Sequence, residues 1–321
     1  MTTRNEIRNY SVHAVEETLA MADYLGESDK SRTDAAAFRR VAAALTKAVK
    51  FIGPMNGIFF EKPDEAKLLE LFRLPFPSIA LEYTYDLEHE PWVAADAPGN
   101  KRDPDTRITG TVVLAEEAEL NGKNGVLTTM FLRVTSFPWR WQPSCISIFV
   151  PYGAEAHLLE ADGKLRPAID LEINIHSPYL LGEIARGREE TPDQAASFLA
   201  QTIWNSTLSI RSLCGILNCS NVRVETVPPS EKLNRKRVSN GKLPFEEYRV
   251  LTVDMEPREP QSSRPGMIGR QSPRQHFRRG HIRRYQSGLS IWIQPQLIGD
   301  PSLGKITKDY EIRKGGKVVY G

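Results

Sequence analysis

The residues best suited to chemistry lie in one run near the C-terminus, Ser272-Pro-Arg-Gln-His-Phe-Arg-Arg-Gly-His-Ile-Arg-Arg-Tyr285. In such a run His276 and His281 could act as base and acid in cleaving a ribose-adjacent phosphodiester, with the arginines stabilising the phosphorane and Tyr285 assisting. Their five-residue spacing brings the imidazoles together on neither a strand nor a helix, so a turn at Gly280 is required. The histidines could instead hydrogen-bond backbone groups, and we favour binding over a metal-independent ribonuclease.

The positive charge around this run is segregated. Between Pro260 and Gly299 there are seven arginines and no acidic residue. From Lys232 to Arg284 the chain carries fourteen Lys plus Arg and five acids, a net charge of +9, whereas the whole chain is +2, so the remainder sums to −7. A concentrated positive surface attracts polyanions.

We therefore predict a nucleic-acid-binding protein, with DNA or RNA as the partner. The predicted contacts are basic residues of two clusters: Arg235, Lys236, Arg237, Arg274, Arg278, Arg279, Arg283 and Arg284. Two alternatives remain open. The cations could pair with the acidic body of the same chain, or they could bind a protein partner with an acidic face.

A second unusual segment is Phe137-Pro-Trp-Arg-Trp-Gln-Pro143. Trp139, Arg140 and Trp141 could stack on bases or form a protein-binding hot spot, because Trp and Arg are enriched in both settings. Large aromatic side chains are more often buried, so the segment could equally be a loop that covers the core.

Familiar enzyme motifs and metal sites are missing from the sequence. It contains no phosphate-binding P-loop, no dinucleotide-binding glycine pattern and no nucleophile elbow. The alternation Asp170, Glu172, Asn174 is more typical of the solvated face of a strand than of a cation site. We expect neither a metal nor a cofactor, and we expect Cys145, Cys214 and Cys219 to be buried thiols.

No run of eighteen apolar residues occurs, and the N-terminus lacks an apolar signal region. We therefore expect a soluble intracellular protein that does not bind membranes.

The elements that must position these residues indicate an α+β fold. Helical spacing of apolar residues predicts a helical N-terminal subdomain over residues 1–77, including a second helix whose pattern runs from Phe38 to Ile52. Short strands with tight turns predict an antiparallel sheet over residues 78–227. The motif Thr191-Pro-Asp-Gln194 predicts the capped start of one long helix that crosses this sheet.

The remainder, residues 228–321, is predicted to be a small, basic, β-rich C-terminal module. Pro228 to Gly241 is expected to be a linker and Leu243 to Val253 a strand. If that strand completes the main sheet, the arginine-rich run is an insertion in one domain and not a domain of its own.

The C-terminal motifs also carry a resemblance. Asn234-Arg-Lys-Arg237, Gly241-Lys-Leu-Pro244, the run Ser272 to Arg284, Gly288-Leu-Ser-Ile-Trp-Ile293 and Lys308-Asp-Tyr310 resemble uncharacterised proteins of tailed bacteriophages and related mobile elements. The likeness covers about the last ninety residues, with a weaker echo at Leu74 to Tyr83. It implies a phage-encoded protein of the host cytoplasm and brings no catalytic residue with it. A phage interaction protein, either inhibitory or virion-associated, is therefore the alternative to a nucleic-acid-binding protein.

Overall fold

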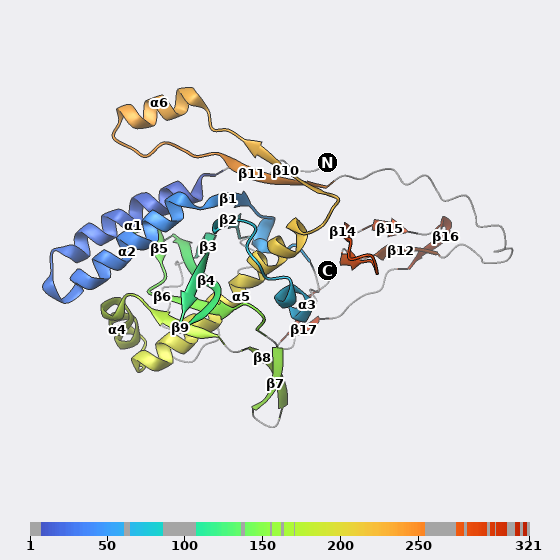
Figure 1. Ribbon diagram of the computed structural model, residues 1–321, viewed down its shortest axis with the longest axis horizontal. Helices are drawn as coiled ribbons and strands as arrows, with labels where there is room; N and C mark the ends of the chain where they lie inside the picture. Colours follow the sequence, from blue (N-terminus) through green and yellow to red (C-terminus); the bar gives the residue numbers. More distant parts are fainter. Residues whose placement is uncertain are drawn as a thin grey trace.

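The computed structural model describes residues 8–60, 65–85, 107–135, 139–154, 156–161, 164–169, 171–253, 274–278, 281–293, 296–298, 300–306, 312–314 and 317–319. A nine-stranded sheet lies at the centre of this described part (Figure 1). Its order is β10-β11-β1-β2-β3-β4-β6-β9, and β5 also pairs with β4. The strands are β1 Val49–Ile52, β2 Ser78–Thr84, β3 Ile108–Leu120, β4 Lys123–Val134, β5 Trp141–Pro143, β6 Ile146–Pro151, β9 Glu172–Ile175, β10 Val222–Val227 and β11 Tyr248–Val253.

The mixture of helices and strands confirms the α+β class, but the sheet is not wholly antiparallel. β1 runs parallel to both of its neighbours, β2 and β11, and the other strand pairs of this sheet are antiparallel. The connection from β1 to β2 contains a helix, α3 (Glu65–Glu70), which makes it long enough for a parallel crossover. A tight hairpin joins β3 to β4, where Asn121 and Gly122 both have positive φ.

Helices cover both faces of the sheet. On one face, α1 (Tyr10–Gly26) and α2 (Arg32–Lys47) pack against buried side chains such as Ala80, Val112 and Leu114. On the other, α5 (Pro192–Leu217) packs against the alternate residues, including Leu81 and Val113. The central strands are apolar on both sides because both sides are buried. α4 (Pro178–Gly187) and the short helices η1 (Asp29–Ser31) and η2 (Met55–Gly57) complete this body.

The long helix starts as the sequence predicts. In α5 the Thr191 hydroxyl accepts a hydrogen bond from Gln194 N at 3.3 Å, and the Gln194 side chain accepts one from Thr191 N at 2.9 Å. This reciprocal pair satisfies two backbone donors at the start of the helix, and Pro192 needs no donor there.

The second helix is shorter than its apolar pattern predicts. α2 ends at Lys47, and Val49–Ile52 forms β1. The prediction of helix in this stretch was wrong because β1 is hydrogen-bonded on both sides, by β2 and by β11, and these long-range pairings outweigh the local helical period.

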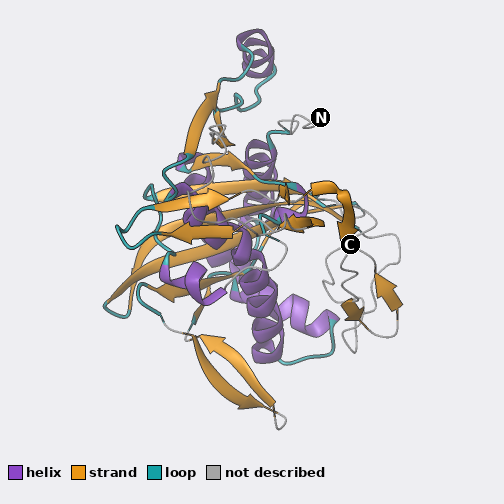
Figure 2. Ribbon diagram, turned by 90° about the vertical axis from the view of Figure 1, so that its right-hand side faces the viewer, coloured by secondary structure: helices purple, strands orange, loops and turns teal. Residues whose placement is uncertain are grey.

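The expected linker after Pro228 is instead structured. Glu231–Ser239 forms helix α6 between β10 and β11, and we call residues 228–247 the arm. Figure 2 shows the arm standing beyond the end of the sheet, and Figure 1 places α6 above α1.

The remaining strands form small separate sheets. β7 (Ala156–Ala161) pairs with β8 (Lys164–Ile169), and β13 (His281–Arg284) pairs with β14 (Ser290–Ile293). The others are β12 Arg274–Arg278, β15 Gln296–Ile298, β16 Asp300–Ile306, β17 Ile312–Lys314 and β18 Lys317–Val319. Because β11 lies between β10 and β1, the central sheet contains strands from all three predicted domains. Independent folding of those domains stays a prediction.

Among the helices that the structure describes, none combines the length and the apolar character needed to cross a membrane.

Candidate functional site

Helix α6 of the arm is stabilised by residues at its own two ends. The Ser230 hydroxyl accepts a hydrogen bond from Leu233 N at 3.5 Å, which begins α6. Glu231 lies in the first turn, and Lys236 and Arg237 lie in the last. This distribution places negative charge at the positive end of the helix dipole and positive charge at its negative end.

The return loop of the arm is fastened to α6 by one amide. The Asn234 side chain accepts a hydrogen bond from Phe245 N at 2.7 Å and donates one to Phe245 O at 2.8 Å. A side chain that satisfies both backbone groups of one residue fixes the distance between helix and loop. The arm therefore has a defined shape although it projects from the body.

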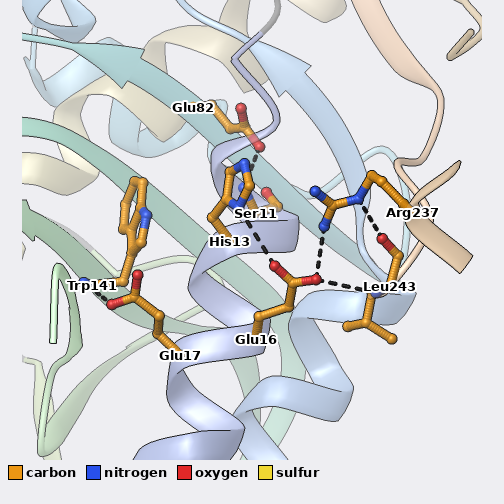
Figure 3. Close-up of polar contacts among 8 residues, drawn as sticks. All are labelled: Ser11, His13, Glu16, Glu17, Glu82, Trp141, Arg237 and Leu243. Carbon is orange, nitrogen blue, oxygen red and sulfur yellow. Dashed lines mark hydrogen bonds and ion pairs between the residues drawn. The ribbon is translucent and has the colours of Figure 1, made fainter. Parts of the chain in front are cut away.

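Glu16 of α1 attaches the arm to the body (Figure 3). Its carboxylate accepts hydrogen bonds from the Arg237 guanidinium at 2.7 Å and from Leu243 N at 3.1 Å. Arg237 also donates to Leu243 O at 2.7 Å, and its guanidinium lies 4.0 Å from the centre of the Phe245 ring. Charge-assisted bonds of this kind are stronger than neutral ones and fix orientation.

Two further groups extend the attachment. His13 lies 3.5 Å from Glu16, and burial lowers the pKa of His13, although Glu16 itself raises it. The buried Lys50 ammonium pairs with Glu246 of the arm and donates to Thr46 O at 2.6 Å. The base of the arm thus contains two ion pairs with α1 and β1.

A buried carboxylate lies below this attachment. Glu82 of β2 accepts hydrogen bonds from Tyr10 N at 2.9 Å, from Ser11 N at 2.6 Å and from the Tyr248 hydroxyl at 2.5 Å. It therefore caps the N-terminus of α1 and links that helix to β11, the strand that returns from the arm. Burial raises the pKa of Glu82, against the hydrogen bonds from Tyr248, Ser11 and Tyr10, which lower it.

Loss of the contacts that attach the arm should measurably lower the free energy of unfolding. Arg237→Gln should lower the free energy of unfolding by about 1.5–3 kcal/mol, because Glu16 loses its charged donor in a nearly buried setting. Arg235→Gln is the matched control: Arg235 is 81% exposed, so its replacement should cost less than about 0.5 kcal/mol. Urea unfolding followed by tryptophan fluorescence measures both values, and equal losses would show that the Arg237 contacts are not stabilising.

An open groove runs along one side of the arm. It has a volume of about 730 Å³, and its lining is mostly apolar. The residues that line it are Pro228, Pro229, Glu231, Asn234, Arg235, Val238 and Ser239. Val238 is 59% exposed although it is apolar. An exposed apolar side chain loses its contact with water when a partner covers it.

The structure separates the three basic residues of the arm that the sequence groups together. Arg235 and Lys236 are exposed on α6, as a contact surface requires. Arg237 is buried, so its assignment as a nucleic-acid contact is wrong: its guanidinium is used by Glu16, Leu243 and Phe245. For Arg237, the alternative that a cation pairs with an acidic residue of the same chain is therefore correct.

The C-terminal candidates lie in two different sheets. His276, Arg274 and Arg278 belong to β12, whereas His281, Arg283 and Arg284 belong to β13. The side chains of Arg274, His276, Arg278 and His281, and all of Arg279, lie outside the described residues. The two histidines are thus not strand neighbours, and a catalytic role for them and Tyr285 stays a prediction.

The described part of this region is attached to the body. Ser220 N, just beyond α5, donates to Ser290 O of β14 at 2.9 Å. Arg284 pairs with Glu70 of α3 at 3.3 Å, and Arg283 lies 4.9 Å from the centre of the Tyr285 ring. Arg283 and Arg284 are both exposed, so a contact with a partner there also stays a prediction.

Of the aromatic candidates, Trp141 is a core residue. It is 2% exposed, packs edge-on against Tyr10 at 4.9 Å, and its backbone N donates to Glu17 at 2.8 Å. Its assignment as a partner contact is wrong because α1 covers the ring. Arg140 is exposed and Trp139 partly buried, so a contact role for these two remains a prediction.

Comparison with known proteins gives the class to which this fold belongs. Residues 61–300 match the model of a family described as AcrVA2-like, the anti-CRISPR type V subtype A2 family. The match covers about three quarters of the 321 residues, so the chain belongs to this family. No curated protein and no solved structure matches the chain.

The family confirms the coarser part of the resemblance, that of a phage or mobile-element protein. The matched residues include the whole arm. Sequence reasoning missed the groove and the Glu16 attachment. One signal was available: Ser230 as an N-cap residue, Glu231 in the first turn, and Lys236 and Arg237 in the last turn form the pattern of a capped helix.

Proposed function

We propose that this protein inhibits a type V CRISPR system by binding a protein of that system, and that its effector nuclease is the partner. The family match carries the proposal, because residues 61–300 include most strands of the central sheet, helix α5 and the arm. The arm supplies the surface: α6 is fixed to the body by Arg237 and Glu16, and its opposite side is open. Such preorganised apolar surfaces favour binding, because little conformational entropy is lost on association.

Protein binding is better supported than the nucleic-acid binding expected from the charge. Of the predicted arginine contacts, Arg237 is buried and paired with Glu16 of the body. The open groove is largely apolar, whereas affinity for nucleic acid comes mainly from cations that contact phosphates. We place the activity in the cytoplasm of the bacterial host, where the effector meets invading DNA.

A transformation assay tests the proposal. Bacteria that carry a type V effector and a guide reject a plasmid with the matching target. Expression of this protein should restore transformation to the level of a plasmid without the target, because the effector is prevented from acting. A strain with a type II effector and the same target is the control and should still reject the plasmid. Persistent rejection in the type V strain, with the protein present in soluble form, would refute the proposed function.

A further inference from the structure

We propose that two copies of this chain associate by pairing their β10 strands antiparallel, so that the central sheets of the two copies become one. This inference goes beyond the proposed function, because it concerns the association of the chain with itself and is measured without the effector. Three features of β10 support it: its place in the sheet, the exposure of its side chains and the order of its charges.

β10 forms one edge of the central sheet (Figure 1). β11 pairs with it over the whole strand, from Val222 opposite Val253 to Val227 opposite Tyr248, in one unbroken register. Among the described residues, no strand pairs with the other side of β10. Such an edge offers backbone N–H and C=O groups to a further strand, and a regular strand without a bulge or an internal proline accepts one most readily.

The side chains of β10 are open to solvent on both faces of the sheet. The four consecutive residues Arg223 to Thr226 are exposed, and Val224 is 40% exposed although it is apolar. Val224 lies opposite Leu251, which packs against the core on the α5 side, so Arg223 and Glu225 point to the other face. In β2, at the centre of the sheet, five consecutive residues are buried instead. Another chain can therefore reach this edge from either face.

The charges of β10 are complementary to those of a second β10. In a symmetric antiparallel pair, one residue faces its own copy, and residues equally far on either side of it face each other. In the pair centred on Val224, Arg223 of each copy lies directly opposite Glu225 of the other, on the same face of the joined sheet. Opposite charges in this position stabilise a strand pair. The segment Val222-Arg-Val-Glu-Thr226 is thus self-complementary.

The same charges disfavour the neighbouring registers. A pair centred on Arg223 places two arginines opposite each other, and a pair centred on Glu225 places two glutamates opposite each other. Like charges in directly opposite positions destabilise a strand pair. The edge therefore favours one register with its own copy, and this selectivity is the reason to prefer a second copy over an arbitrary strand as the occupant.

The mass of the full-length protein in solution, measured as a function of concentration, tests the inference. Sedimentation velocity is recorded after nuclease treatment, so that bound nucleic acid does not join the chains. A single strand pair makes a small interface, so we expect a reversible dimer that is well populated at about 100 µM and dissociates on dilution. A parent that stays monomeric up to that concentration would overturn the inference.

Charge reversal at the edge identifies the surface. Arg223→Glu and Glu225→Arg each convert both cross-strand pairs of the dimer into like-charge pairs, so each variant alone should self-associate at least about tenfold more weakly. Mixed in equal amounts, the two variants should associate like the parent, because one then carries only acids and the other only arginines at these positions. Arg32→Glu and Asp29→Arg reverse an exposed ion pair between η1 and α2 and should dimerise like the parent.

A further variant keeps the test decisive if a single replacement disturbs folding. Arg223→Glu/Glu225→Arg exchanges the two charges and leaves the edge self-complementary, so it should dimerise like the parent. Single variants that dimerise as tightly as the parent, or an exchanged double variant that stays monomeric, would show that the copies do not meet at β10.

The outcomes are independent of the proposed function. A dimer that depends on the β10 charges supports this inference even if the protein fails to inhibit a type V system. A monomeric parent that loses its affinity for the effector on Arg223→Glu would assign the edge to the effector, which overturns this inference and leaves the proposed function standing.

Discussion

Glu82→Ala is expected to lower the free energy of unfolding by about 3–5 kcal/mol, the largest effect of any substitution considered. The carboxylate is buried, and three donors converge on it, from Tyr10, Ser11 and Tyr248. Removing it leaves these donors buried without an acceptor, and each unsatisfied group costs about 1–3 kcal/mol. Urea unfolding monitored by circular dichroism provides the measurement.

Tyr248→Phe is the control, because it removes only one of the three donors. It should cost about 1–2 kcal/mol. If Glu82→Ala were no more destabilising than Tyr248→Phe, the cap on α1 would contribute nothing and Glu82 would not unite α1 with β11.

The carboxyl group of Glu82 also makes the free energy of unfolding depend on pH. Burial raises the folded-state pKa of Glu82, so the folded protein binds a proton more tightly than the unfolded chain. Its contribution to stability is therefore fully present below the unfolded pKa and is lost as pH rises through the folded pKa. Relative to Glu82→Gln, which does not titrate, the parent should lose stability as pH rises through this window.

Arg235→Glu/Val238→Asp is expected to abolish inhibition of the type V system. The double variant changes the net charge on the open side of α6 by −3, because it removes one positive charge and adds two negative ones. It also removes the exposed apolar side chain of the groove. Loss of an apolar anchor together with charge reversal should weaken binding by roughly a hundredfold or more. Transformation of the targeted plasmid should then fall to the level seen without the protein.

A matched variant controls for the change in charge. Lys30→Glu/Met55→Asp alters net charge by the same amount at exposed positions of η1 and η2. It should inhibit like the parent, and both double variants should unfold at the parent's urea midpoint within error. Equal inhibition by all three proteins would show that the arm is not the docking surface.

The sequence predicts elements whose determinants are local. α5 could be located because its capping box and apolar stripe lie within the helix itself. The β3–β4 hairpin could be located because Asn121-Gly122 specifies the turn. In both cases the residues that cause the structure are the residues that adopt it.

The arm could not be predicted in this way. Its position depends on Arg237 and Glu16, which are 221 residues apart. A basic, proline-flanked stretch resembles a linker until that long-range partner is known. β1 presents the same difficulty, since its apolar spacing continues that of α2 and only pairing with β2 and β11 makes it a strand.

The candidate site was predicted only in part, for the same reason. A count of arginines gives net charge but not the partners of each guanidinium. Arg237 is buried against Glu16, whereas Arg235 and Arg284 are exposed and form only exposed pairs with Glu231 and Glu70. The class of function came from the family match, not from any local motif.

Direct association with the effector tests the central claim most simply. The purified protein and a purified guide-free type V effector are mixed, treated with nuclease, and separated by size-exclusion chromatography with light scattering in ~0.5 M salt, where electrostatic attraction to nucleic acid is strongly screened. We predict that the two proteins elute as one complex. Its mass should equal that of a whole number of copies of this protein plus a whole number of copies of the effector. Separate elution, or a complex that disappears on nuclease treatment, would contradict inhibition by protein binding.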